Sequence, residues 1–173
     1  MLLVTGALLA AAGLLFVAAV GYFIFAFDRA FDSDEFGLRS IDEATAAAAL
    51  DRRDIGIPDG FTFASMTEYR VFVGFDSYTG HYNAPGDLAA ARRAIATTNP
   101  TLPAFIPVDC GHEIVVHDFK EMDDFSCDGT DLMLSTRTDP QTDNYAGTPP
   151  DTESLLLANR GGKVTLFVVA RGH

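Results

Sequence analysis

Residues 154–170 read SLLLANRGGKVTLFVVA, two apolar runs on either side of a short turn. The runs, 154–159 and 163–170, are rich in Leu, Val and Phe and have the length of ordinary strands. Between them, Gly161 and Gly162 supply the positive φ angles that tight hairpin turns need. This stretch therefore predicts a β-hairpin, and with it an antiparallel sheet.

The rest of the chain after residue 39 alternates helical and extended patterns. Ser40 and Glu43 match a capping box that opens an alanine-rich helix through residue 53, and Asp87 opens a second helix that ends before Asn99-Pro100. Further strands are predicted at 69–73, 78–83 with a turn around Gly80, 113–117 and 132–137. Two helices and several strands in this order predict an α+β fold with a mainly antiparallel sheet.

The first 27 residues contain no charged or histidine side chain, although the chain has 24 acidic and 12 basic residues. Roughly 20 apolar residues suffice for a helix to cross a bilayer. A cleaved signal peptide normally has a basic start and a shorter apolar run. The segment 1–27 is therefore predicted to be an uncleaved transmembrane helix that anchors the chain in a lipid bilayer.

Small residues recur at helical spacing in this segment, at Gly6, Ala10, Gly13 and Gly21. Such a stripe lets a second helix approach closely. It predicts packing against a membrane protein partner, with a simple lipid anchor as the alternative.

These patterns divide the chain into a membrane helix (1–27), an acidic juxtamembrane linker (28–39) and one α+β domain (40–173). Arg29 and Arg39 follow the apolar segment, which by itself weakly favours a cytoplasmic domain. A pair of cysteines favours the opposite side. We expect a single-pass protein of the cell membrane with an extracytoplasmic C-terminal domain.

The formal net charge of −12 argues against a phosphate-rich partner, because like charges repel. We therefore expect no nucleic acid binding. Solvated surface accounts for most of the acidity, and a cationic partner is the alternative.

Cys110 and Cys127 are the only cysteines. In an exported domain such a pair predicts a disulfide. Two free buried thiols are one alternative, and a soft metal site that includes His112 is a weak second one. No cofactor is predicted.

No catalytic motif is recognisable. The segment from His112 to His117 resembles the zinc protease signature but has three residues between Glu113 and His117, where that signature has two. There is no Gly-x-Ser-x-Gly elbow, and no serine lies in a local motif that pairs it with His or Asp. Acidic residues near Gly129 do not follow the EF-hand spacing.

These observations predict a non-catalytic accessory or assembly subunit of a larger cell-envelope membrane complex, which contacts its partner through the N-terminal helix and the extracytoplasmic domain. One alternative is a membrane-anchored extracytoplasmic module that binds a ligand or peptide between sheet and helices. A second is an extracytoplasmic hydrolase. The aromatic residues that would line a ligand pocket are Phe61, Phe63, Tyr69, Phe72, Phe75 and Tyr78.

Overall fold

The computed structural model describes residues 20–22, 37–72, 74, 76–122, 124–138 and 151–172. The chain divides into two units, Met1–Phe36 and Gly37–His173. The second unit holds the folded domain described below.

Little of the first unit is described. Val20, Gly21 and Tyr22 are helical, and all three are exposed. Nowhere in the described residues is there a helix with the length and apolarity that a membrane crossing requires. The predicted membrane helix, apart from 20–22, and its packing residues Gly6, Ala10 and Gly13 lie outside the described residues and stay predictions.

The described residues of the second unit form one seven-stranded sheet in which every neighbouring pair is antiparallel. Its order is β1-β2-β3-β7-β6-β5-β4. The predicted compact domain with a mainly antiparallel sheet is confirmed. The strands are β1 (Gly37–Ser40), β2 (Thr62–Arg70), β3 (Ser77–Ala84), β4 (Ile106–Val108), β5 (Thr130–Thr138), β6 (Thr152–Arg160) and β7 (Lys163–Arg171).

The hairpin of β6 and β7 lies at the centre of this sheet, as the two apolar runs predicted. Arg160 pairs with Lys163 across a two-residue turn, and both turn glycines have positive φ. Side chains on both faces of β6 are buried: Leu155 and Leu157 belong to one core, and Leu156 to the other. The middle of the hairpin is apolar on both faces, and both faces are covered.

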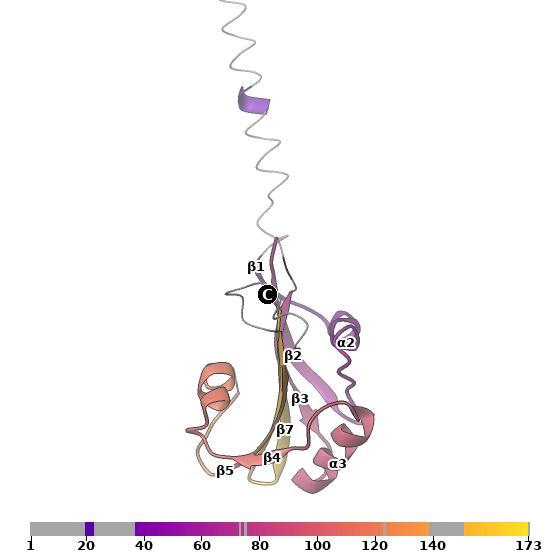
Figure 1. Ribbon diagram of the computed structural model, residues 1–173, viewed down its shortest axis with the longest axis vertical. Helices are drawn as coiled ribbons and strands as arrows, with labels where there is room; N and C mark the ends of the chain where they lie inside the picture. The colour runs from indigo at the N-terminus through magenta and orange to yellow at the C-terminus, as the bar shows by residue number, and fades with distance from the viewer. Residues whose placement is uncertain are drawn as a thin grey trace, which may run out of the picture. The chain divides into compact units, whose positions relative to one another are not determined.

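Two α-helices cover one face, α2 (Glu43–Asp51) and α3 (Leu88–Thr98). In Figure 1 they lie on one side of the sheet, which is seen edge-on. Asp42 and Asp87 are their N-caps, and each carboxylate accepts a hydrogen bond from the backbone N–H three residues on. Both predicted helices are present, but Ser40 is not the cap of the first, since it ends β1.

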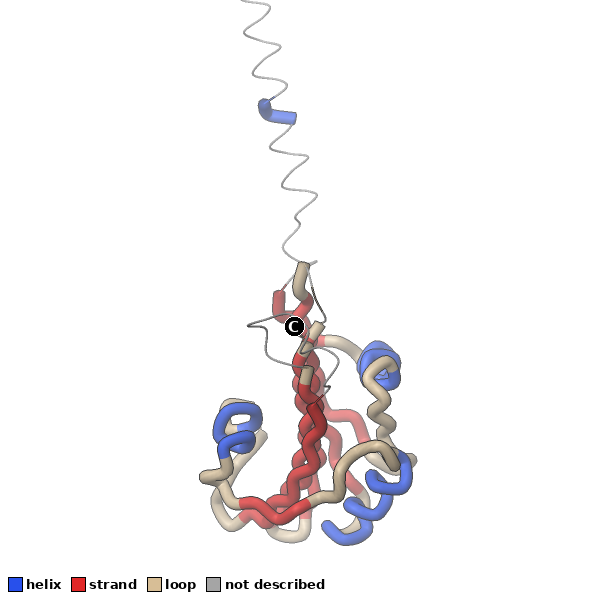
Figure 2. Tube along the Cα trace, viewed as in Figure 1, coloured by secondary structure: helices blue, strands red, loops and turns tan. Residues whose placement is uncertain are grey.

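The opposite face is covered by a short π-helix, η1 (Val115–Phe119). Figure 2 shows this helical segment across the sheet from α2 and α3. The predicted strand at 113–117 is therefore wrong. Val115 and Phe119 are fully buried on the sheet, one helical turn apart, and this packing outweighs the strand preference of the β-branched run.

Gly80 lies in the middle of β3, not in the turn predicted around it; β2 and β3 are joined through residues 71–76. A Cβ atom on Gly80 would lie 2.4 Å from the carbonyl oxygen of Ser65 and 2.8 Å from Cα of Met66. Only glycine permits this close approach of the two strands.

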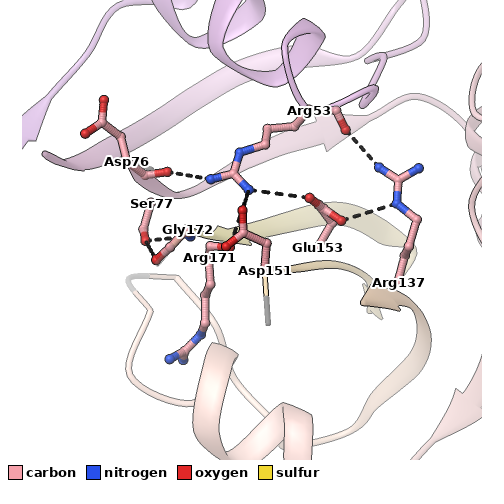
Figure 3. A network of polar contacts seen from close by, with 8 residues as sticks. All are labelled: Arg53, Asp76, Ser77, Arg137, Asp151, Glu153, Arg171 and Gly172. Carbon is pink, nitrogen blue, oxygen red and sulfur yellow. Dashed lines mark hydrogen bonds and ion pairs between the residues drawn. The ribbon is translucent and has the colours of Figure 1, made fainter. Parts of the chain in front are cut away.

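An ion network joins Arg53, which follows α2, to strand residues and to the segments next to them (Figure 3). The guanidinium of Arg53 donates to the backbone oxygen of Asp76 at 2.8 Å and to the Asp151 carboxylate at 3.2 Å. Glu153 lies 3.5 Å from Arg53 and 3.2 Å from Arg137. Because these charges are mutually satisfied within the fold, we assign them a structural role.

Tyr82 gives the folded domain a testable dependence on alkaline pH. Burial raises the pKa of its hydroxyl to about 12, and the negative charge of Glu43 adds to the rise. Because the folded value exceeds that of the unfolded chain, this contribution to stability is complete below about pH 10 and is lost as the pH rises to about 12. Within that window the ionisation of Tyr82 should lower the free energy of unfolding by about 1.4 kcal/mol for each unit of rising pH.

Urea denaturation of the full chain in detergent, repeated across this window, measures the slope. Burial also raises the pKa of Tyr78, so the Tyr82→Phe variant should keep part of the slope but show a smaller one than the wild type. Identical slopes for wild type and variant would contradict the assignment to Tyr82.

Candidate functional site

A cleft of about 350 Å³ lies between η1 and the sheet strands β1 to β3. The sheet side contributes mostly polar side chains, and η1 with the residues that follow it contributes the other wall. The lining residues are Leu38, Ser65, Thr67, Thr79, Gly80, His81, His117, Asp118, Glu121 and Met122.

A β-bulge sets which side chains of β2 face this cleft. The pairing shifts between Phe63, opposite Tyr82, and Ser65, opposite His81. Phe63 and Tyr82 pack in the core beneath α2 and α3, with their rings 5.6 Å apart. The bulge therefore lets Ser65 reach the cleft face, although regular alternation would put it on the same face as Phe63.

The opposite wall is fixed by covalent and ionic contacts. The disulfide Cys110–Cys127 closes the segment that contains η1, which confirms the predicted bond. Arg171, the last residue of β7, donates to the Asp118 carboxylate at 2.6 Å. Together with the burial of Phe119, these contacts hold a short helix against the sheet.

His81 occupies the centre of the polar constellation. Its side chain is 9% exposed, its Nδ1 lies 3.1 Å from the Ser65 hydroxyl oxygen, and its Nε2 lies 3.5 Å from a carboxylate oxygen of Asp124. The ring also packs against Phe167, at 5.5 Å between centroids. A hydroxyl, an imidazole and a carboxylate thus form a continuous chain at the edge of the cleft.

The electrostatics of the lining are negative. Asp118 and Glu121 line the cleft, and no Lys or Arg is among the lining residues of the described chain. Arg171 pairs with Asp118 from outside, whereas Glu121 is exposed. His81 and His117 add ring nitrogens that can accept or donate.

The disulfide involves two of the three residues of the weak metal alternative. The sulfur atoms of Cys110 and Cys127 are bonded to each other, so neither is free to bind a metal as a thiolate. His112 has a buried Nδ1 without a hydrogen-bond partner among the described residues. Within the described part of the chain, no three His, Cys, Asp or Glu side chains are grouped to hold a metal ion.

Of the aromatic side chains expected in a ligand pocket, the five that the structure describes do not line the cleft. Phe61, Phe63 and Tyr78 pack in the core beneath α2 and α3, while Tyr69 and Phe72 are exposed. Phe75 lies outside the described residues.

Sequence reasoning missed Ser65 and His81, and it considered Asp124 only as one of the acidic residues near Gly129. Ser65 and His81 are on different strands, and Asp124 follows η1 in a loop. A usable signal was the polar alternation of Ser65 with Thr67 and of Thr79 with His81, which marks one face of adjacent strands as polar. Their convergence depended on a bulge and on a helix that the pattern did not predict.

The chain matches no known protein family, no curated protein and no solved structure. The function is therefore argued from the cleft and its residues.

The disulfide should contribute strongly to stability, because it closes a loop of 17 residues around η1. A double variant, Cys110→Ser with Cys127→Ser, should unfold with a free energy about 3 kcal/mol lower. Urea denaturation of the full chain in detergent measures this. Reductant should lower the stability of the wild type and leave the double variant unchanged; equal midpoints for oxidised wild type and double variant would contradict the prediction.

Proposed function

We propose that this protein is a membrane-anchored, extracytoplasmic binding module that holds a small, polar, positively charged ligand in the cleft between η1 and strands β1 to β3. The observation that carries the proposal is the acidic, hydroxyl-rich lining of that cleft. The uncharged segment 1–27 supports the anchor, and the disulfide supports an oxidising compartment.

The size of the cleft suits a small molecule. Its volume of about 350 Å³ is at the lower end of the range for ligand sites, roughly 300–1,000 Å³. Leu38 and Met122 supply apolar surface, while Thr67 and Thr79 supply hydroxyls for hydrogen bonds. A single sugar ring or a short amine is the size of ligand that such a site favours.

The charge of the cleft determines which sign of charge on a ligand is favoured. Glu121 is exposed at the cleft, and the chain as a whole carries a formal charge of −12. A cationic group approaches with the field, whereas an anion approaches against it. An ammonium also donates hydrogen bonds, which carboxylate and imidazole acceptors satisfy.

Three sugars of one shape and different charge test the proposal: glucosamine, glucose and glucuronate. The full chain in detergent should bind glucosamine at least about tenfold more tightly than the other two, a difference of about 1.4 kcal/mol. Calorimetric titration measures the affinities. Equal affinities for the three sugars, or no binding of glucosamine, would count against a cation-selective cleft.

Two glutamine variants localise the binding. Glu121→Gln removes the exposed carboxylate of the cleft and should weaken glucosamine binding, while leaving the fold intact. Glu113→Gln removes an exposed carboxylate just before η1 that does not line the cleft, so it should leave the affinity unchanged.

A second candidate function is an accessory or assembly subunit of a larger cell-envelope membrane complex. It is favoured by β1, an edge strand whose Leu38 is 77% exposed and pairs across the ladder with Tyr69, itself 49% exposed. Exposed edge strands offer unpaired backbone groups to another chain. Contact with a membrane partner would then combine this edge with the N-terminal helix.

Affinity purification from native membranes in mild detergent tests this candidate. A stoichiometric membrane partner should co-purify with the wild type and be lost with Leu38→Lys, because a charged lysine on an edge strand disfavours pairing. Val116→Lys changes an exposed apolar residue of η1 and should retain the partner. A partner-free, monodisperse monomer from native membranes would count against the candidate.

A further inference from the structure

Ser65, His81 and Asp124 are arranged as a nucleophile, a base and an orienting carboxylate. The Ser65 hydroxyl oxygen is 3.1 Å from Nδ1 of His81, and the second ring nitrogen is 3.5 Å from the Asp124 carboxylate. Ser65 and His81 both line the cleft. The three groups stand in the order of a serine–histidine–aspartate triad, with the two ring nitrogens exchanged: Nδ1 of His81 faces the serine and Nε2 faces the carboxylate.

The carboxylate determines which ring nitrogen carries the proton. An ionised Asp124 only accepts hydrogen bonds, so it favours the tautomer with the proton on Nε2. Nδ1 is then the acceptor, and the Ser65 hydroxyl donates to it. In this tautomer the imidazole is ready to take the serine proton as a general base.

The local backbone is built to make this contact. The bulge between Phe63 and Ser65 places Ser65 opposite His81, and the absence of a side chain on Gly80 lets the two strands approach at that point. Asp124 has a left-handed backbone with φ of 64°, which is uncommon for a residue other than glycine. Three separate local irregularities therefore converge on one histidine.

The three groups differ in their exposure to solvent. Ser65 is exposed at the cleft, so a substrate can reach its oxygen. His81 is buried against Phe167, which restricts the orientation of the ring. The Asp124 side chain is 81% exposed, so it acts on the ring from the solvent side as a positioning residue.

We propose that the cleft is also a hydrolytic site, in which Ser65 attacks the carbonyl carbon of a small carboxylic ester. The Ser65 oxygen forms a bond to that carbon while its proton passes to Nδ1 of His81. The ester C–O bond then breaks, and the departing alcohol takes the proton from His81. His81 then takes a proton from water, and the resulting hydroxide attacks the acyl carbon. The bond between this carbon and the Ser65 oxygen breaks, the carboxylic acid leaves, and His81 returns the proton to the Ser65 oxygen.

This inference goes beyond the binding function and does not rest on the charge of the ligand. The acyl group must be short, because the whole cleft has a volume of about 350 Å³. The Thr67 and Thr79 hydroxyls on the same face are donors that the cleft offers to the developing oxyanion.

A fluorophosphonate tests the nucleophile directly, since a serine activated in this way displaces fluoride and keeps the phosphonyl group. The full chain in detergent should gain one adduct, located on Ser65 by peptide mass spectrometry, and should hydrolyse p-nitrophenyl acetate. Ser65→Ala should abolish both. Ser40→Ala, which removes an exposed serine of β1 outside the cleft, should retain both.

Variants of His81 and Asp124 distinguish a role in the reaction from a role in the stability of the fold. His81→Gln should slow labelling at least about 100-fold. Asp124→Asn should lower the maximal labelling rate at least about tenfold while leaving the half-saturating probe concentration unchanged. Circular dichroism checks the fold; if the buried His81 variant does not fold, Ser65→Ala and Asp124→Asn carry the test.

The result that would overturn the inference is equally direct. No adduct on Ser65, an adduct spread over Ser40 and other serines, or a labelling rate unaffected by Asp124→Asn would each do so. Two readouts on the wild type separate this inference from the binding function: a labelled Ser65 without glucosamine binding would overturn only the binding function, and glucosamine binding without an adduct on Ser65 would overturn only this inference.

Discussion

The fold depends on one constraint: the central hairpin of β6 and β7 is apolar on both faces. Leu155 and Leu157 face the layer of α2 and α3, whereas Leu156 and Phe167 face η1. A sheet with such strands cannot leave either face in water, because each exposed Leu or Phe would forgo roughly 1.5–3 kcal/mol of burial. Cover on both sides is therefore required by the sequence of this hairpin.

The two faces of the sheet are covered to different extents, and the face with less cover contains the cleft. The first face is covered by two capped α-helices. On the second face, η1 is too short to be stable alone, and the Cys110–Cys127 disulfide and the Arg171–Asp118 pair fix it in place. The apolar contacts of η1 are with β5 to β7, and beside them the polar face of β2 and β3 forms the cleft.

Local signals explain which parts of the fold were predictable. The hairpin, both helices and the disulfide each depend on a few neighbouring residues or on an obvious pair, and all were predicted. The strand assigned to 113–117 was wrong because Val115 and Phe119 pack at helical spacing on a sheet that a local pattern does not reveal. Gly80 was read as a turn because its real role, a close approach to Ser65, is a contact between strands.

The candidate site was harder to predict for the same reason. Ser65, His81 and Asp124 come from two strands and a loop, and a bulge brings the first two together. No spacing rule encodes a bulge, so a search for serine motifs passes over Ser65. The cysteines were found because their chemistry does not depend on such geometry.

The polar face beside η1 is hard to explain by stability alone. His81 is buried and contacts Phe167, at the margin of the second apolar core. A β-branched apolar residue there would extend that core and bury its side chain without a hydrogen-bonding requirement, whereas a buried imidazole needs partners on both nitrogens. Ser65 lies 3.1 Å from one ring nitrogen and the Asp124 carboxylate lies 3.5 Å from the other, with a bulge beside Ser65 and a positive φ at Asp124. Bulges are over-represented next to active sites, so the bulge beside Ser65 supports the proposal that the cleft is functional.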